Sequence, residues 1–162
     1  MRKSIFGLLL AFGVLAATPA QAFDSDWRVK AGMLSLENDD GAATNVGLVY
    51  AMDFAGILGA EVEANTSIAD GEFDAGIATV DHSTMQVGGY ATLTTPGPIY
   101  FKAKAGLVYN DVDIGGASDS SIGEAIGIGA GFFGFEVEYT RSTVDFGGTD
   151  VDIDYISVAY GF

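Results

Sequence analysis

Hydrophobic and polar residues alternate along most of the chain that follows residue 26. A period of two places successive side chains on opposite faces of a β-strand. The segment 99–109 shows this best, because every second residue is apolar from Ile99 to Tyr109. The alternation predicts eight strands, at residues 27–36, 44–54, 57–68, 82–94, 99–109, 122–132, 135–143 and 151–162.

The connections between these strands alternate between long and short. The long ones, at 37–43, 69–81, 110–121 and 144–149, are mostly rich in acidic residues and glycine, whereas the short ones surround Gly56, Pro96 and Gly134. Short turns at one end and long loops at the other are typical of an up-and-down meander, and pairing the last strand with the first would leave no exposed edge. We therefore predict an all-β, eight-stranded antiparallel up-and-down barrel.

One strand face is apolar and the other carries eight charges. A soluble calyx would point the charged face outward, and a transmembrane barrel would point it inward. Four cations and four anions cancel on this face, although the whole chain has 22 acidic and 7 basic residues. Such balance favours an enclosed network, because an unpaired buried charge is costly. The predicted lumen residues are Arg28, Lys30, Glu61, Glu63, Lys102, Lys104, Glu136 and Glu138.

Aromatic residues gather at the end of the meander that has the short turns. A girdle of aromatic side chains marks the membrane boundary in transmembrane barrels. The predicted girdle, which we expect on the periplasmic side, consists of Trp27, Phe54, Phe101, Phe132, Phe135, Tyr160 and Phe162. A transmembrane barrel is thus the favoured arrangement, and the soluble calyx remains the alternative.

Residues 1–22 have the pattern of a cleaved secretory signal peptide: Arg2 and Lys3, 13 apolar residues and an Ala20-x-Ala22 site. An uncleaved membrane anchor is disfavoured, because a spanning helix needs about 20 residues. We expect residues 23–162 to form the barrel domain. The acidic composition argues against nucleic-acid binding, and the absence of cysteine excludes disulfides and thiolate metal sites.

The whole chain after the signal peptide resembles the small eight-stranded bacterial outer-membrane β-barrel proteins, which include the outer-membrane protein A transmembrane domain and the X-type barrels. The resemblance rests on the eight alternating segments, the asymmetry of turns and loops, Phe135-Glu-Val-Glu-Tyr139 and the terminal Tyr160-Gly-Phe162. It implies export through the general secretory pathway, contact with outer-membrane lipid and lipopolysaccharide, and recognition of the C-terminal strand by the barrel-assembly machinery. We expect a monomer without a cofactor.

Each of three further sites has two interpretations, a functional role and an ordinary structural explanation. Arg141 falls on the lipid face and either snorkels, which we favour, or contacts a lipopolysaccharide phosphate. Asp150, Asp152 and Asp154 have spacing that could serve a divalent cation, but solvated charge explains them better. Some barrels of this group are lipid A-modifying enzymes that use His and Ser, yet His82 and Ser83 are adjacent and project to opposite faces.

The sequence therefore favours a non-enzymatic integral outer-membrane protein with a structural or surface role exerted through its acidic loops. A narrow porin-like channel for small solutes or ions is the main alternative. A lipid A-modifying enzyme and a soluble periplasmic ligand-binding calyx are less favoured.

Overall fold

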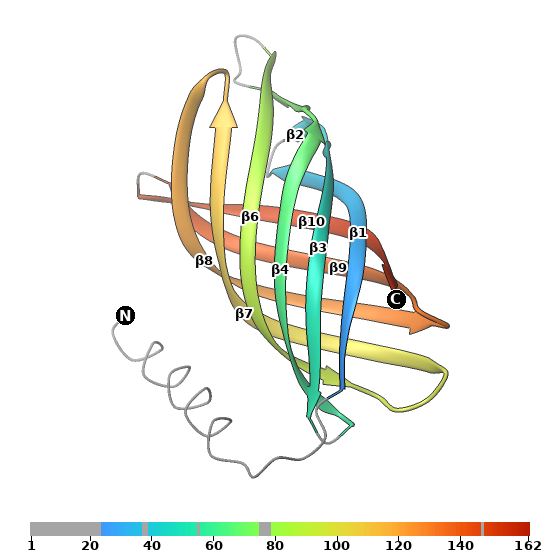
Figure 1. Ribbon diagram of the computed structural model, residues 1–162. Coiled ribbons are helices and arrows are strands. Elements are labelled where there is room, and N and C mark those ends of the chain that lie inside the picture. The colour runs from blue at the N-terminus through green and yellow to red at the C-terminus, as the bar shows by residue number, and fades with distance from the viewer. Residues whose placement is uncertain (1–23, 37–38, 55, 75–78, 147) are drawn as a thin grey trace.

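The computed structural model describes residues 24–36, 39–54, 56–74, 79–146 and 148–162 (Figure 1). Within these ranges the regular elements are ten β-strands. They are β1 (Asp24–Leu36), β2 (Asp39–Gly41), β3 (Ala43–Phe54), β4 (Leu58–Ala69), β5 (Gly71–Asp74), β6 (Thr79–Thr94), β7 (Ile99–Ile114), β8 (Ala117–Phe132), β9 (Phe135–Phe146) and β10 (Thr149–Gly161). The predicted signal peptide lies outside the described residues.

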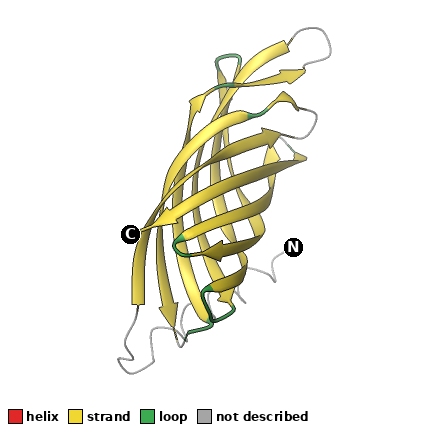
Figure 2. Ribbon diagram, turned by 90° about the vertical axis from the view of Figure 1, so that its right-hand side faces the viewer, coloured by secondary structure: helices red, strands yellow, loops and turns green. Residues whose placement is uncertain are grey.

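Eight long strands close into an antiparallel barrel, and the predicted fold class is confirmed. Each long strand pairs with its neighbours in chain order, and β10 pairs with β1 to complete the ring. The short β2 and β5 pair with each other at the rim, where they continue the lines of β3 and β4. Figure 2 shows the strands inclined to the long axis of the barrel. Among the described residues, no helix is long and apolar enough to span a membrane.

The strand register fixes the size of the barrel. A row of paired residues that starts at Asp26 on β1 returns to the same strand at Leu36, a shear of 36 − 26 = 10 residues. With eight strands, this shear corresponds to a tilt of about 40° and an interior that side chains can fill. The row passes through Ala51, Glu61, Tyr90, Gly106, Ala125, Ser142 and Ile153.

Tight turns close one end of the barrel. Phe132 pairs with Phe135, so Phe133 and Gly134 form a two-residue hairpin turn with φ values of 48° and 83°. Positive φ at both positions is the requirement of a type I′ turn, and glycine adopts it without steric cost. We call this end, with the turns near Gly56, Gly97 and Gly134, the short-turn end.

In the half of the barrel next to the short-turn end, the apolar face points outward and the charged face inward. The outward side chains of Phe101, Ile128 and Val158 are 65%, 66% and 51% exposed. Lys102, Lys104 and Glu138 point inward and are buried. This is the transmembrane arrangement rather than the calyx arrangement, and the exposed side chains form an apolar belt around the barrel.

In the opposite half the pattern is reversed. Leu34, Val112, Val144 and Ile153 point inward and form an apolar cluster with Leu36 and Tyr155. The outward positions on β7, β9 and β10 in this half are polar, including Asp111, Asp113, Asp145 and Asp150. This half, which we call the hairpin end, therefore has the pattern of a barrel in water.

The strands at the hairpin end are longer than the sequence pattern predicts. The prediction that residues 110–121 form a loop is wrong, because β7 and β8 continue to Ile114 and from Ala117 around a turn at Gly115 and Gly116. Strand residues also replace much of the loops predicted at 69–81 and 144–149. Aspartate, serine and glycine have a low strand propensity. Pairing with neighbouring strands overrides that propensity here and keeps these residues in the sheet.

Candidate functional site: a salt-bridge network in the barrel

Alternate strands supply the charges of the barrel interior. All eight predicted lumen residues lie inside, as pairs two residues apart on β1, β4, β7 and β9. Level with these pairs, the strands between them carry small or uncharged inward residues, such as Gly127 and Gly129 on β8 and Ser157 on β10. Long side chains thus face short ones across each strand pair, which leaves them room to reach the axis.

The layer nearest the short-turn end joins Arg28, Glu61, Lys102 and Glu136. Arg28 Nη1 donates to Glu61 Oε1 at 3.2 Å and to Glu136 Oε2 at 3.0 Å. Lys102 Nζ donates to the same two carboxylates, at 2.9 Å and 2.5 Å. Each cation therefore bridges two anions from other strands. The Tyr100 hydroxyl adds a hydrogen bond of 3.0 Å to Glu136.

A second layer repeats this arrangement two residues further along each strand. Lys30 Nζ lies 3.0 Å from Glu63 and 2.6 Å from Glu138, while Lys104 Nζ lies 2.5 Å and 2.7 Å from the same carboxylates. Lys102 links the layers, because its Nζ lies 2.7 Å from Glu138 Oε2. The eight residues form one continuous network, which we call the lumen network.

The lumen network is both buried and electrically balanced. The side chains of its three lysines and four glutamates are at most 3% exposed, and Arg28 is 13% exposed. Four positive and four negative groups cancel, and each ammonium has several acceptors. Geometry of this kind is needed to offset the cost of removing charges from water.

Aromatic rings and a glycine fit around the network. Lys104 Nζ lies 4.1 Å from the ring centroid of Tyr90, within the range of a cation–π interaction. At Gly131 a Cβ atom would overlap the ring of Tyr100, so this glycine lets the tyrosine reach Glu136. Tyr90 and Tyr100 are uncharged, so the pattern of charges along the chain did not predict their place in the lumen.

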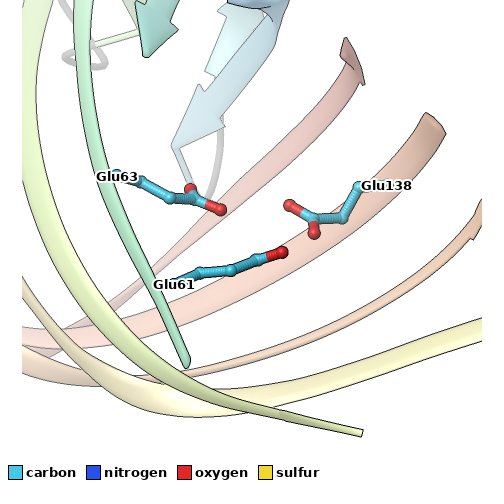
Figure 3. Close-up of side chains that lie close together, drawn as sticks. All are labelled: Glu61, Glu63 and Glu138. Atoms are coloured by element: carbon cyan, nitrogen blue, oxygen red, sulfur yellow. The ribbon is translucent and has the colours of Figure 1, made fainter. Parts of the chain in front are cut away.

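Three carboxylates of the network lie close enough to hold a metal ion. One oxygen from each of Glu61, Glu63 and Glu138 lies within 4.8 Å of the other two. Figure 3 shows Glu61 and Glu63 extending from β4 towards Glu138 on β9. The ammonium groups of Lys102 and Lys104 already occupy hydrogen-bonding positions on these oxygens. The group is therefore neutralised by the protein itself, and we assign no metal site to it.

A polar cavity opens at the short-turn end. It has a volume of about 310 Å³ and is lined by Asp26, Asp53, Arg28, Glu61 and Tyr100, among others. Arg28 and Glu61 belong to the lumen network, so the cavity ends where the network begins. Asp26 accepts a hydrogen bond of 2.7 Å from Arg28 Nε, which ties the mouth to the first layer.

Beyond the network, one wall of the lumen is polar. Asn45 donates to Thr84 Oγ1 at 3.0 Å and accepts from Ser67 at 3.0 Å, and Gln86 donates to Asn110 at 2.5 Å. These residues face the apolar cluster across the lumen. We did not predict this wall from the sequence, although His82, Thr84 and Gln86 show polar residues at a period of two.

The predicted aromatic girdle lies at the short-turn end on the outer surface. Six of its members are 45% to 76% exposed, and Phe54 is half-buried. Phe135 packs on Tyr160 with ring centroids 4.8 Å apart, across the β9–β10 pair. The seven residues are Trp27, Phe54, Phe101, Phe132, Phe135, Tyr160 and Phe162.

Arg141 points outward from β9 and is paired. Its Nε and Nη2 donate to the two carboxylate oxygens of Asp154 at 2.7 Å and 2.8 Å. Asp154 also accepts from the Tyr139 hydroxyl at 2.7 Å, and Asp152 accepts from Thr143 at 2.7 Å. Two members of the predicted aspartate triplet, Asp152 and Asp154, are thus hydrogen-bonded to β9. Asp150 faces Asp145 across the same pair.

His82 and Ser83 lie on opposite faces of β6. His82 is 1% exposed and points into the lumen near the hairpin end. Ser83 is on the outward side and only partly exposed. The structure therefore does not bring these two together as a base and a nucleophile.

The fold is shared with several solved outer-membrane proteins. Neisserial surface protein A is 14% identical, with a TM-score of 0.64 over 87% of this chain and 98% of that chain. The outer membrane enzyme PagL is 16% identical, with a TM-score of 0.58 over 83% and 98%. Ail of Yersinia pestis, solved with the heparin analogue sucrose octasulfate, is 13% identical, with a TM-score of 0.57 over 88% and 100%.

The sequence matches no protein-family model and no curated protein. At identities this low, the structural likeness establishes the fold and leaves the activity open. It confirms the resemblance to small outer-membrane β-barrels that the sequence indicated. The neighbours include both an enzyme and surface proteins, so function has to be argued from this chain's own residues.

Proposed function

Because the chain has the fold of the small outer-membrane β-barrels, we propose that it is a non-enzymatic integral outer-membrane protein with a structural and surface role. The observation that carries this proposal is the outward apolar belt combined with an inward, balanced charge network. In water this arrangement would expose large apolar side chains and bury charges. In a bilayer both faces have the environment that their chemistry requires.

The dimensions of the belt support membrane insertion. On β7 it extends from Ile99 to Tyr109, which corresponds to about 25 Å along the axis of a barrel tilted by about 40°. The apolar band of outer-membrane barrels is about this tall. The aromatic girdle marks its lower edge, and Tyr109 is its uppermost residue on β7.

The two ends of the barrel support one orientation. The short-turn end would face the periplasm, and the hairpin end would project from the cell, where its polar outer face meets water. The C-terminal β10 closes the barrel by pairing with β1. If the assembly machinery recognises β10, it would bind the strand whose pairing completes the fold.

The lumen network argues against an open pore. Bridging contacts of 2.5 Å to 3.2 Å join four strands across the lumen, and the cavity at the short-turn end stops at this layer. An eight-stranded barrel is narrow enough for such side chains to fill it. We therefore propose a rigid, closed barrel rather than a constitutive channel for solutes.

The hairpin end would supply the surface role. Its outward aspartates, including Asp111, Asp113 and Asp145, give it a negative charge that suits cations or basic partners. A polyanion of the kind bound to Ail in its crystal structure would be repelled. An enzymatic role has less support, because His82 and Ser83 point to opposite faces.

Two measurements on purified outer membranes test the proposal. We expect the protein in the outer-membrane fraction, with a gel mobility that changes on boiling, as a barrel that resists detergent would show. A protein found in the soluble periplasm without such a shift would contradict it. Planar-bilayer recordings address the channel alternative: steady conductance from the wild-type barrel would overturn the closed lumen, and a silent membrane supports it.

A further inference from the structure

The apolar belt is not equally tall around the barrel. On β9 it comprises Phe135, Val137 and Tyr139, about 10 Å along the barrel axis, against about 25 Å on β7. Above Tyr139 the outward positions of β9 are Arg141, Thr143 and Asp145. The same early change to polar residues occurs on β10. We call the outward group that begins there the polar notch, and it consists of Glu124, Arg141, Thr143, Asp152 and Asp154.

The register shows which residues lie level with the notch on other strands. Because the shear is 10 over eight strands, a row of paired residues followed from β1 to β10 rises towards the hairpin end by about one and a quarter residues at each strand. The row through Arg141 reaches Ala91 on β6, three strands away. The level of Arg141 on β6 is therefore about four residues above Ala91, at Val87. By the same rule Thr143 is level with Met85.

At this level the two sides of the barrel differ in chemistry. Val87 and Met85 on β6 are apolar and 44% and 47% exposed. On β9 the Arg141 side chain is 46% exposed, and it pairs with Asp154. With one cation and three carboxylates, the notch has a net charge of 1 − 3 = −2. Hydrocarbon is unfavourable for such groups, whereas Val87 and Met85 suit it.

The barrel wall also opens directly above the notch. Strands β8 and β9 are paired from Phe132 and Phe135 only as far as Glu124 and Thr143. Beyond this pair, β8 continues with β7 and β9 continues with β10, and the two hairpins end apart in Figure 1. Backbone groups at this split need polar surroundings, because unpaired groups are costly in hydrocarbon.

We propose that the polar notch is a contact surface for the polar headgroups of the surrounding lipid. The headgroups would reach deeper into the membrane beside β8, β9 and β10 than beside β4, β6 and β7, so that the hydrocarbon layer is locally thinner there. The notch offers these headgroups a guanidinium and three carboxylates, and its hydrogen-bonded Arg141–Asp154 pair lies at their level. The inference rests on the proposed insertion of the barrel in a membrane.

Single nitroxide labels can measure this difference, because the chain has no cysteine of its own. Thr143→Cys and Met85→Cys carry labels at one level on opposite sides of the barrel. Val62→Cys and Val158→Cys are the controls, because these two positions also lie at one level. The row of paired residues through Val62 reaches Asp152 on β10, five strands away. Five strands raise the row by about six residues, so the level of Val62 on β10 is about six residues closer to the short-turn end than Asp152, near Val158. The depth of each label in phosphatidylcholine vesicles follows from its collisions with oxygen and with a water-soluble nickel chelate.

We expect the label at 143 to lie about 10 Å nearer the aqueous boundary than the label at 85, because the belt on β9 ends about four residues lower. The two control labels should be equally deep. Equal depths at 143 and 85, with deep controls, would overturn the proposal. Water-accessible labels at 62 and 158 would instead show that the barrel is not inserted, which is a failure of the proposed function.

A filled notch provides the second test. Replacing both Arg141 and Asp154 with leucine removes the ion pair without leaving either charge alone, and it should move the label at 143 towards the depth of the label at 85. The matched control replaces Asp111 and Asp113 on β7 with leucine and should leave the label at 143 where it is. No movement in the filled-notch variant would overturn the proposal.

Discussion

The two halves of this barrel bury opposite kinds of side chain on the same strands. On β7, Lys102 and Lys104 point inward near the short-turn end, while Val112 points inward near the hairpin end. The outward residues change in the opposite sense, from Phe101 and Ala103 to Asp111 and Asp113. Continuous strands cannot exchange their faces, so the change lies in the residues, and it follows the change from lipid to water that we propose for the surroundings.

The comparison shows that burial in a barrel is decided by the environment on each side. In the half with the apolar belt, the outer face would contact lipid, so charged side chains are stabilised only in the interior, where they form a balanced network. In the hairpin half, the outer face is solvated, and the interior holds an apolar cluster around Leu34 and Ile153 beside the uncharged polar wall of Asn45 and Gln86. The same shear and strand number serve both arrangements.

The largest effect should come from unbalancing the lumen network. Lys104 has a fully buried side chain that contacts Glu63 and Glu138. Lys104→Met removes one of the four cations and leaves the buried network with an uncompensated negative charge, so we expect the free energy of unfolding to fall by about 3–5 kcal/mol. Urea titrations of the barrel refolded in lipid vesicles measure this change. Adding Glu63→Gln should restore part of the loss, and a neutral effect of the single substitution would contradict an enclosed network.

Truncation of the upper core should be nearly as damaging. Leu34 is fully buried in the apolar cluster. Leu34→Ala should lower the free energy of unfolding by about 2–5 kcal/mol, because it removes apolar contacts and leaves a cavity. Met33→Ala is the matched control on the outer face, where lipid chains can close around the smaller side chain. Equal losses from both variants would show that the hairpin half has no packed core.

A charge placed on the outer surface should discriminate between the halves. Val62 is 49% exposed in the belt, and Val62→Arg should cost about 2–4 kcal/mol if hydrocarbon surrounds it. Ser120 is outward and exposed on the hairpin half of β8, so Ser120→Arg should change stability by less than about 0.5 kcal/mol. The same titrations compare the two, and similar small effects would argue that the belt faces water.

The smallest effect concerns the ion pair on the outer surface. Arg141 and Asp154 are both partly exposed, and such pairs contribute about 0.2–1 kcal/mol. Arg141→Leu alone should therefore cost little, and it should cost less in the presence of Asp154→Leu. A double-mutant cycle in vesicles gives the coupling energy. A coupling of several kcal/mol would place the pair in hydrocarbon and contradict its contact with headgroups.

The sequence predicted the half with the belt better than the hairpin half. Alternation of charged and apolar residues, as in Phe101 and Lys102, defines the faces without knowledge of neighbours. In the hairpin half the alternation is also present, since Val112 lies between Asp111 and Asp113. Aspartate and glycine are typical of loops, so this reversed pattern was interpreted as loop sequence.

The candidate site was predictable in its members but not in its contacts. The eight charges could be selected because they share one face, whereas the pairing of Lys102 with both Glu61 and Glu136 depends on register and shear. The bond between Arg141 and Asp154 is likewise a cross-strand contact, and alternation along one strand does not contain it. Tyr90 and Asn45 were missed because uncharged lumen residues resemble those of any strand.

The thiol reactivity of single cysteines along the outer face of β7 tests whether lipid surrounds one half of the barrel and water the other. Cysteines at 103, 105, 107, 111 and 113 would be treated with a membrane-impermeant reagent while the barrel is in phosphatidylcholine vesicles. We expect reaction at 111 and 113 and protection at 103, 105 and 107. Equal reaction at all five positions would show that both halves face water and would contradict insertion of the belt in a membrane.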